Sequence, residues 1–181
     1  MLDLVMERWY DEITMRELAQ RSGVALQTVV NRFGTKDGVL AAMLADPRTQ
    51  RAFGGQRQGA SPDDVVGAVE LLMRDYERAG DAALRLLALE TRIPALQPVL
   101  AFGRRGHREW LERTFPGALT GRSRPERERA LLRLICATDV YTWRILRRDQ
   151  GLSRRRVAAA IVEMVQAVYA SCGAASVEEV A

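Results

Sequence analysis

The side chains best suited to chemistry in this sequence are two amides, a hydroxyl and an ammonium group that lie within ten residues of each other. Gln27 and Asn31 are four residues apart, so on a helix they share one face. Either amide can form a paired hydrogen bond with adenine, and Thr28 can donate its hydroxyl to a phosphate. Lys36 is the only lysine of the chain and stands at the start of a further predicted helix, where backbone N–H groups favour anions. Together these four side chains predict contact with a nucleic acid.

Two short helices joined by a tight turn must position these side chains. Thr14 followed by Glu17 is a capping-box pattern, which places a helix start at about 15. Gly23 can take the positive φ that ends this helix. A second helix is expected over about 25–32 and a third over about 36–45. The amides then lie on the second helix and the lysine opens the third.

Small and apolar residues supply the packing that such a corner needs. Ala19 allows a close helix crossing, and Val24 and Val29 provide the apolar side of the second helix. Leu18 and Phe33 close the small core, so the pattern is typical of a helix-turn-helix, whose second helix can enter the major groove. The spacing alone leaves an alternative open. Many helical proteins contain such a corner without binding DNA, and polar residues on a short helix are usually just solvated.

A dense run of about 30 residues also resembles a known family. It reads Thr14-x-Arg16-Glu17-Leu18-Ala19-x-x-Ser22-Gly23-Val24, then Thr28-Val29, then Phe33-Gly34-Thr35-Lys36-Asp37-x-x-Leu40. This pattern is similar to the N-terminal domain of the TetR family of one-component repressors. The resemblance implies a homodimer that binds a palindromic operator in double-stranded DNA and is released by a small-molecule effector. The candidate DNA-binding residues are Thr14, Arg16, Gln27, Thr28, Asn31, Arg32 and Lys36.

Some features depart from the family pattern. Ala25 stands where members usually have a Ser or Thr cap, and alanine loses roughly 1 kcal/mol there. Val30 stands where a tyrosine often contacts a phosphate. Residues 1–50 carry six basic residues against seven acidic ones, a local net charge of −1, although the chain as a whole carries +4. These features leave open a weak DNA affinity, or one that falls steeply with salt.

Composition and periodicity predict the fold class. The chain has 181 residues, with 48% hydrophobic and 28% charged residues, as is usual for a globular protein. Helical periodicity dominates, so we expect an all-α protein. We predict a helix-turn-helix DNA-binding domain at 1–46, a linker at 47–60, and a ligand-binding and dimerisation domain at 61–181. The last domain is expected to hold helices at about 62–79, 81–92, 95–115, 125–149 and 153–171.

The sequence also argues against several other classes. No apolar run approaches the roughly 18 residues that would span a bilayer, so no membrane association is expected and a cytoplasmic location is the default. Cys136 and Cys172 are too few for a disulfide framework and lack zinc-ligand spacing. A single histidine and the absence of a glycine-rich phosphate loop disfavour an enzyme, and no metal or cofactor is expected.

The last predicted helix carries an apolar stripe that could join two copies of the chain. The helix could bury this stripe on its own domain, or could form a four-helix interface with the same helices of a second copy. The family resemblance favours the dimer. The candidate interface residues are Val157, Ile161, Met164 and Val168.

The expected effector site lies among the longer helices. Apolar and aromatic groups with a few polar ones would suit a small molecule, although for any one of them ordinary core packing is the simpler interpretation. His107 and Asp139 are the more informative pair, because an ionisable group among apolar neighbours needs a partner or a role. The alternative function is a helical partner-binding or ligand-binding protein of the same fold that has lost specific DNA binding. The candidate ligand-binding residues are Met73, Tyr76, Phe102, His107, Trp110, Cys136, Asp139 and Tyr141.

Overall fold

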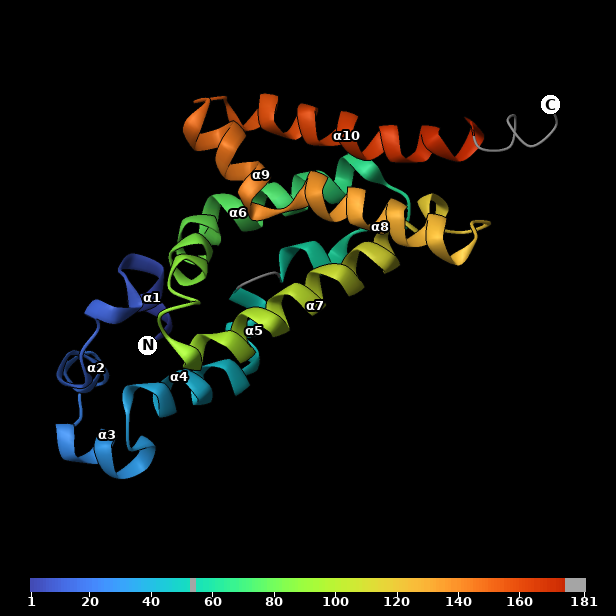
Figure 1. The fold of residues 1–181 in the computed structure, drawn as a ribbon. Coiled ribbons are helices and arrows are strands. Elements are labelled where there is room, and N and C mark those ends of the chain that lie inside the picture. The colour runs from blue at the N-terminus through green and yellow to red at the C-terminus, as the bar shows by residue number, and fades with distance from the viewer. Residues whose placement is uncertain (53–54, 175–181) are drawn as a thin grey trace. The chain divides into compact units, whose positions relative to one another are not determined.

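A computed structural model describes residues 1–52 and 55–174, and this part of the chain contains helices and turns but no strand (Figure 1). The all-α prediction is therefore confirmed. Within the same residues, no helix is both long enough and apolar enough to cross a membrane. The chain divides into two compact units, and the long helices α6 (Val65–Ala88) and α7 (Gln97–Thr114) contribute to both of them.

Unit 1 contains the described residues of Met1–Gly55 together with Arg78–Gly103. Its helices at 15–22, 26–33 and 36–45 lie within about one residue of the predicted ones. The caps at Thr14, Gly23 and Thr35 are each encoded within a few residues, which explains why these boundaries agree. The elements are α1 (Leu2–Glu7), η1 (Tyr10–Glu12), α2 (Met15–Ser22), α3 (Leu26–Phe33), α4 (Lys36–Ala45) and α5 (Pro47–Ala52).

One apolar core holds unit 1 together. Side chains from the end of α6 and the start of α7 pack against those of α1, α2 and α4. Arg85 of α6 donates hydrogen bonds to the carbonyl oxygens of Val5 and Met6 at 3.3 and 2.7 Å, which satisfies acceptors at the end of α1. The buried core residues are Leu4, Val5, Tyr10, Ile13, Leu18, Leu40, Met43, Leu86, Leu89, Leu96 and Leu100.

Unit 2 contains Gln56–Glu77 and the described residues from Arg104 onward. In this unit α8 and α10 run side by side, and α9 with η5 connects them (Figure 1). Trp110, Trp143 and Phe115 are its largest fully buried side chains, each at most 1% exposed. The elements after α7 are η4 (Pro116–Ala118), α8 (Arg124–Thr138), α9 (Val140–Arg144), the π-helical turn η5 (Ile145–Asp149) and α10 (Arg154–Ala174).

Two predicted helix boundaries in the longer helices are wrong. Gly80 does not end a helix, since α6 continues through it to Ala88. Gly80 is buried, so packing in the core compensates for the low helix propensity of glycine. The predicted helix at 125–149 is broken at Asp139, whose backbone is extended and whose carboxylate accepts a hydrogen bond from the Tyr141 N–H at 2.8 Å. That carboxylate caps α9, which is why the chain restarts a helix there.

The predicted linker at 47–60 contains regular structure. Residues 47–52 form α5, and the 3-10 turn η2 (Gln56–Gly59) begins unit 2. Residues 53–54 of this segment and residues 175–181 of the predicted last domain lie outside the described residues. The division into 1–46, 47–60 and 61–181 stays a prediction.

Candidate nucleic-acid interface and effector site

Local hydrogen bonds fix both ends of α2, the helix that precedes the candidate recognition helix α3. The Thr14 hydroxyl accepts from the Glu17 N–H at 3.2 Å, and the Glu17 carboxylate accepts from the Thr14 N–H at 2.9 Å. These bonds to Thr14, followed by one from Arg8, hold the pKa of Glu17 below its usual value. Helix α2 ends at Gly23, whose φ of 66° is in the left-handed region. The Val24 N–H then reaches the Ala19 carbonyl at 3.1 Å, which completes the end of the helix.

Helix α3 has one buried side and a broad exposed side. Val29 is 6% exposed, so it anchors the helix, as predicted from the sequence. Val24 is 43% exposed, and its predicted place in the small core is therefore wrong, because it lies in the turn before the helix begins. Leu26 and Val30 are 39% and 37% exposed. Apolar groups thus stand beside the amides on the outer surface, where they could contact thymine methyl groups.

The two amides of α3 act as a pair. Gln27 Nε2 donates to Asn31 Oδ1 at 2.7 Å, and both residues are exposed. This bond uses one N–H of Gln27 and the side-chain oxygen of Asn31. The Gln27 oxygen can still accept and the Asn31 nitrogen can still donate. An acceptor beside a donor matches the N6 and N7 edge of adenine.

Lys36 is directed towards its own domain. Its ammonium donates to the Tyr10 and Asp11 carbonyl oxygens at 2.9 and 3.3 Å, and lies 4.5 Å from the centre of the Tyr10 ring. The Tyr10 hydroxyl donates to Asp37 at 2.6 Å, and burial together with this carboxylate raises the pKa of Tyr10. Lys36 therefore connects η1 to the start of α4. Its contact with a phosphate stays a prediction.

The other candidate DNA-binding residues are on the surface of unit 1. Arg16, Thr28 and Arg32 are exposed, and the Arg32 guanidinium lies 5.5 Å from the centre of the Phe33 ring. Ala25 occupies the N-cap of α3 with extended backbone and no side-chain cap. The missing cap inferred from the sequence is thus a feature of the structure.

The candidate ligand-binding residues separate into groups. Tyr76, His107 and Trp110 come together in unit 2, and Met73 is fully buried in the same unit. Phe102 belongs to unit 1 and is 50% exposed. The remaining three are elsewhere in unit 2: Cys136 and Tyr141 are exposed, and Asp139 caps α9.

A polar cluster with buried Asp75 and Thr138 surrounds the half-buried His107. Arg57 of η2 donates to the His107 Nδ1 atom at 2.9 Å and forms an ion pair with Asp75 at 3.2 Å. The Thr138 hydroxyl donates to the Leu134 carbonyl at 2.7 Å, so it accepts from His107 Nε2, which lies 3.0 Å away. The imidazole is therefore neutral, with its proton on Nε2. Burial, followed by the charge of Arg57, lowers the pKa of His107 to about 3.

Sequence reasoning missed Arg57 and Asp75, the two charged members of this cluster. Arg57 carried no signal, because it lies in a predicted linker without periodicity. Asp75 did carry one: it falls at helical spacing on the buried stripe that includes Leu72 and Ala79. A carboxylate in such a stripe requires a buried partner. No group of three or more His, Cys, Asp or Glu residues in the part of the chain that the structure describes could hold a metal ion.

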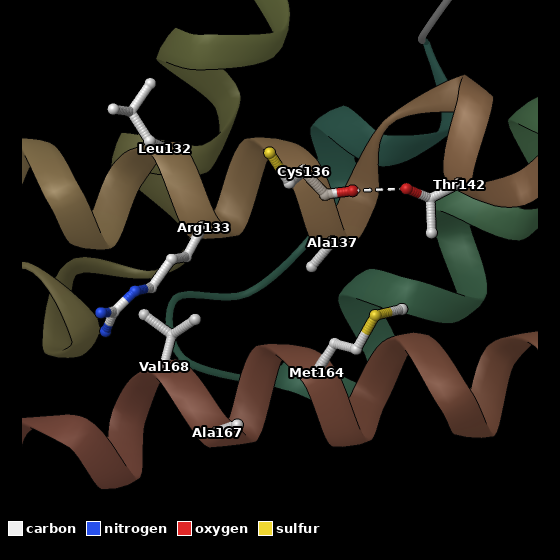
Figure 2. A pocket seen from close by; sticks show the side chains of 8 residues that line it. All are labelled: Leu132, Arg133, Cys136, Ala137, Thr142, Met164, Ala167 and Val168. Carbon is white, nitrogen blue, oxygen red and sulfur yellow. Dashed lines mark hydrogen bonds between the residues drawn. The ribbon is translucent and has the colours of Figure 1, made fainter.

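The candidate interface residues lie on two sides of α10. Val157, Ile161 and Val168 are at most 4% exposed and pack within unit 2 itself, whereas Met164 is 37% exposed. Met164 lies in a shallow, mainly apolar groove between α8 and α10 (Figure 2). The groove is lined by Leu132, Arg133, Cys136, Ala137, Thr142, Met164, Ala167 and Val168.

Comparison with known proteins identifies the N-terminal segment. Residues 2–43 match the family described as bacterial regulatory proteins, tetR family. The matched residues include the capping box at Thr14, the turn at Gly23 and all of α3. No curated protein and no solved structure matches the chain. The resemblance predicted from the sequence is therefore confirmed by the family match.

Proposed function

We propose that this chain is a DNA-binding repressor, and the match of residues 2–43 to the tetR family of bacterial regulatory proteins supports this. In this proposal it binds a palindromic operator as a homodimer and is released by a small-molecule effector. The observation that carries the proposal is the outer face of α3. The linked amides of Gln27 and Asn31 are exposed there, while Val29 on the opposite side anchors the helix in its domain.

A gel-shift experiment with DNA from upstream of the protein's own gene tests operator binding. We expect low-salt retardation that weakens as salt is raised, because phosphate contacts release counterions. The double variant Gln27→Ala/Asn31→Ala should lose roughly 1–3 kcal/mol of discrimination for each adenine contact that is removed. Gln97→Ala, an exposed amide at the start of α7, is the matched control and should bind as the parent does.

The alternative is a helical protein that has lost specific DNA binding. The net charge of −1 over residues 1–50 and the missing cap at Ala25 favour it. This alternative predicts that neither the parent nor any variant retards the upstream DNA at low salt. Retardation by the parent that the double variant lacks would exclude it.

For the dimer, we propose that the exposed sides of α8 and α10 form the contact between two copies. Leu132 is 50% exposed and Met164 37% exposed, and Cys136 and Ala167 beside them are also exposed (Figure 2). Adjacent apolar side chains of this kind on a surface favour an interaction site. In this arrangement Val157, Ile161 and Val168 pack α10 onto its own unit and do not contact the second copy.

The oligomeric state of two surface variants tests this contact. Leu132→Asp should convert a dimer into a folded monomer, because the side chain is half exposed and its loss costs little in the monomer. Val66→Asp, a 58% exposed position on α6, is the control and should remain a dimer. Sedimentation equilibrium measures both. A Leu132→Asp protein that stays dimeric at the parent's concentration would place the contact elsewhere.

A further inference from the structure

The Arg57 guanidinium is surrounded by side chains of unit 2 of the kinds that bind an organic cation. Its side chain is 11% exposed, and it pairs with the Asp75 carboxylate, which is 2% exposed. Two aromatic rings flank it: the guanidinium carbon lies 5.6 Å from the centre of the Tyr76 ring and 5.7 Å from that of Trp110. A carboxylate and two ring faces together are the groups that recognise a planar organic cation.

His107 adds a hydrogen-bond acceptor for the guanidinium. His107 Nδ1 accepts from the guanidinium, while Nε2 is committed to the Thr138 hydroxyl, which itself donates to a backbone carbonyl. The neighbouring bonds therefore fix Nδ1 as an acceptor. Asp75 and His107 thus present two acceptors to one flat donor group. A phosphate or carboxylate ligand would meet a buried carboxylate here and would be repelled.

The residues that surround Arg57 lie on two long helices, whereas Arg57 itself lies on a short turn. Asp75 and Tyr76 lie on α6, and His107 and Trp110 lie on α7. Arg57 lies on the four-residue turn η2, which is held by the bond from Trp110 Nε1 to the Arg57 carbonyl at 2.9 Å. The Arg57 and Gln56 N–H groups approach Asp75 only at 3.3 and 3.4 Å.

We propose that these helices form a receptor for a planar organic cation, such as an aryl amidinium or a guanidinium compound, and that Arg57 is its built-in occupant. An effector of this class displaces the Arg57 side chain. It then binds Asp75, His107 and the two aromatic rings in place of the guanidinium. The turn that holds Arg57 directly follows Gly55, the last residue of the first segment of unit 1. Because the inference names the class of the effector, it rests on the proposed function.

Competition with the tethered side chain sets the expected size of the effect. A ligand that binds only when Arg57 has left the site has its affinity reduced by the fraction of open protein. Removing the guanidinium in Arg57→Ala abolishes this competition. We therefore expect benzamidinium to bind Arg57→Ala at least about tenfold more tightly than it binds the parent.

Calorimetric titration of the free protein with benzamidinium tests this, with benzamide as the neutral probe of the same shape. Arg147→Ala is the matched variant, because Arg147 also pairs with a carboxylate of α6, Glu77, at 2.8 Å but lies outside the cluster. We expect saturable benzamidinium binding to Arg57→Ala, parent-like affinity in Arg147→Ala, and no binding of benzamide. Equal affinity of the two variants, or equal binding of the two probes, would overturn the proposal.

A second measurement covers the case in which Arg57→Ala does not fold. His107 is the only histidine of the chain, so its ring protons give unambiguous NMR signals in the parent protein. Benzamidinium should shift them saturably, and benzamide should not; unchanged signals would overturn the inference. No DNA is present in either experiment, so a failure here leaves operator binding untouched. A failed gel shift with successful probe binding would reject only the proposed function.

Discussion

Acid should destabilise this protein through a single imidazole. His107 is neutral in the folded chain because Arg57 donates to its Nδ1 atom at 2.9 Å and its Nε2 proton bonds to Thr138. Protonating Nδ1 would place a second cation against the guanidinium in a partly buried site. The perturbation is therefore a change in pH, and the comparison variant is His107→Gln, which cannot bind a proton.

The two pKa values give the direction and size of the effect. Burial, followed by the charge of Arg57, lowers the pKa of His107 from 6.5 to about 3. Between these values the unfolded chain binds more protons than the folded chain. The contribution to stability is therefore complete above about pH 6.5 and is lost as the pH falls towards 3. Because the His107 ring keeps some exposure, the loss between about pH 8 and about pH 5 is about 1–2 kcal/mol.

Urea denaturation at these two pH values measures the loss. Carboxylates titrate in both proteins, so the parent should lose about 1–2 kcal/mol more than His107→Gln. The ring protons of His107, the only histidine, should show no titration step by NMR in the same range. A midpoint near the ordinary value, or equal losses in the two proteins, would refute the assigned network.

Three further predictions concern the N-terminal helices. Ala25→Ser should stabilise the chain by about 1 kcal/mol in urea denaturation, because Ala25 is an N-cap without a side-chain bond; an unchanged midpoint would contradict this. Lys36→Met should cost about 1–2 kcal/mol through its two bonds to backbone oxygens and its contact with the Tyr10 ring, whereas exposed Arg16→Met should stay within about 0.5 kcal/mol of the parent. A parent-like Lys36→Met would remove the bridge between η1 and α4. Thr14→Ala should cost about 1 kcal/mol by breaking the capping box of α2, with exposed Thr28→Ala as control, and equal midpoints for the two variants would count against the box.

Much of unit 1 could be predicted because its signals are local. The Thr14 cap, the Gly23 turn and the start of α4 at Lys36 are each encoded within a few residues, so the chain needs no distant partner to begin or end those helices. The same local pattern carried the family resemblance. Val24 was placed on the wrong side because its position before α3 depends on how the turn is oriented.

The longer helices required information that no short segment contains. Gly80 is an ordinary helix end by propensity, yet it lies inside α6 because the core packs around it. The pattern of α10 identified an apolar stripe but not what covers it. In the structure Ile161 is fully buried in its own unit and Met164 is left exposed.

The sequence by itself determined an all-α chain whose N-terminal helix-turn-helix presents Gln27 and Asn31 on one face, because helical period and caps act over a few residues. Only the tertiary structure decided that Lys36 turns inward and that Arg57 packs beside Asp75 of α6 and His107 of α7. Arg57 and His107 are 50 residues apart. Contacts over that separation follow from packing, which no local pattern encodes.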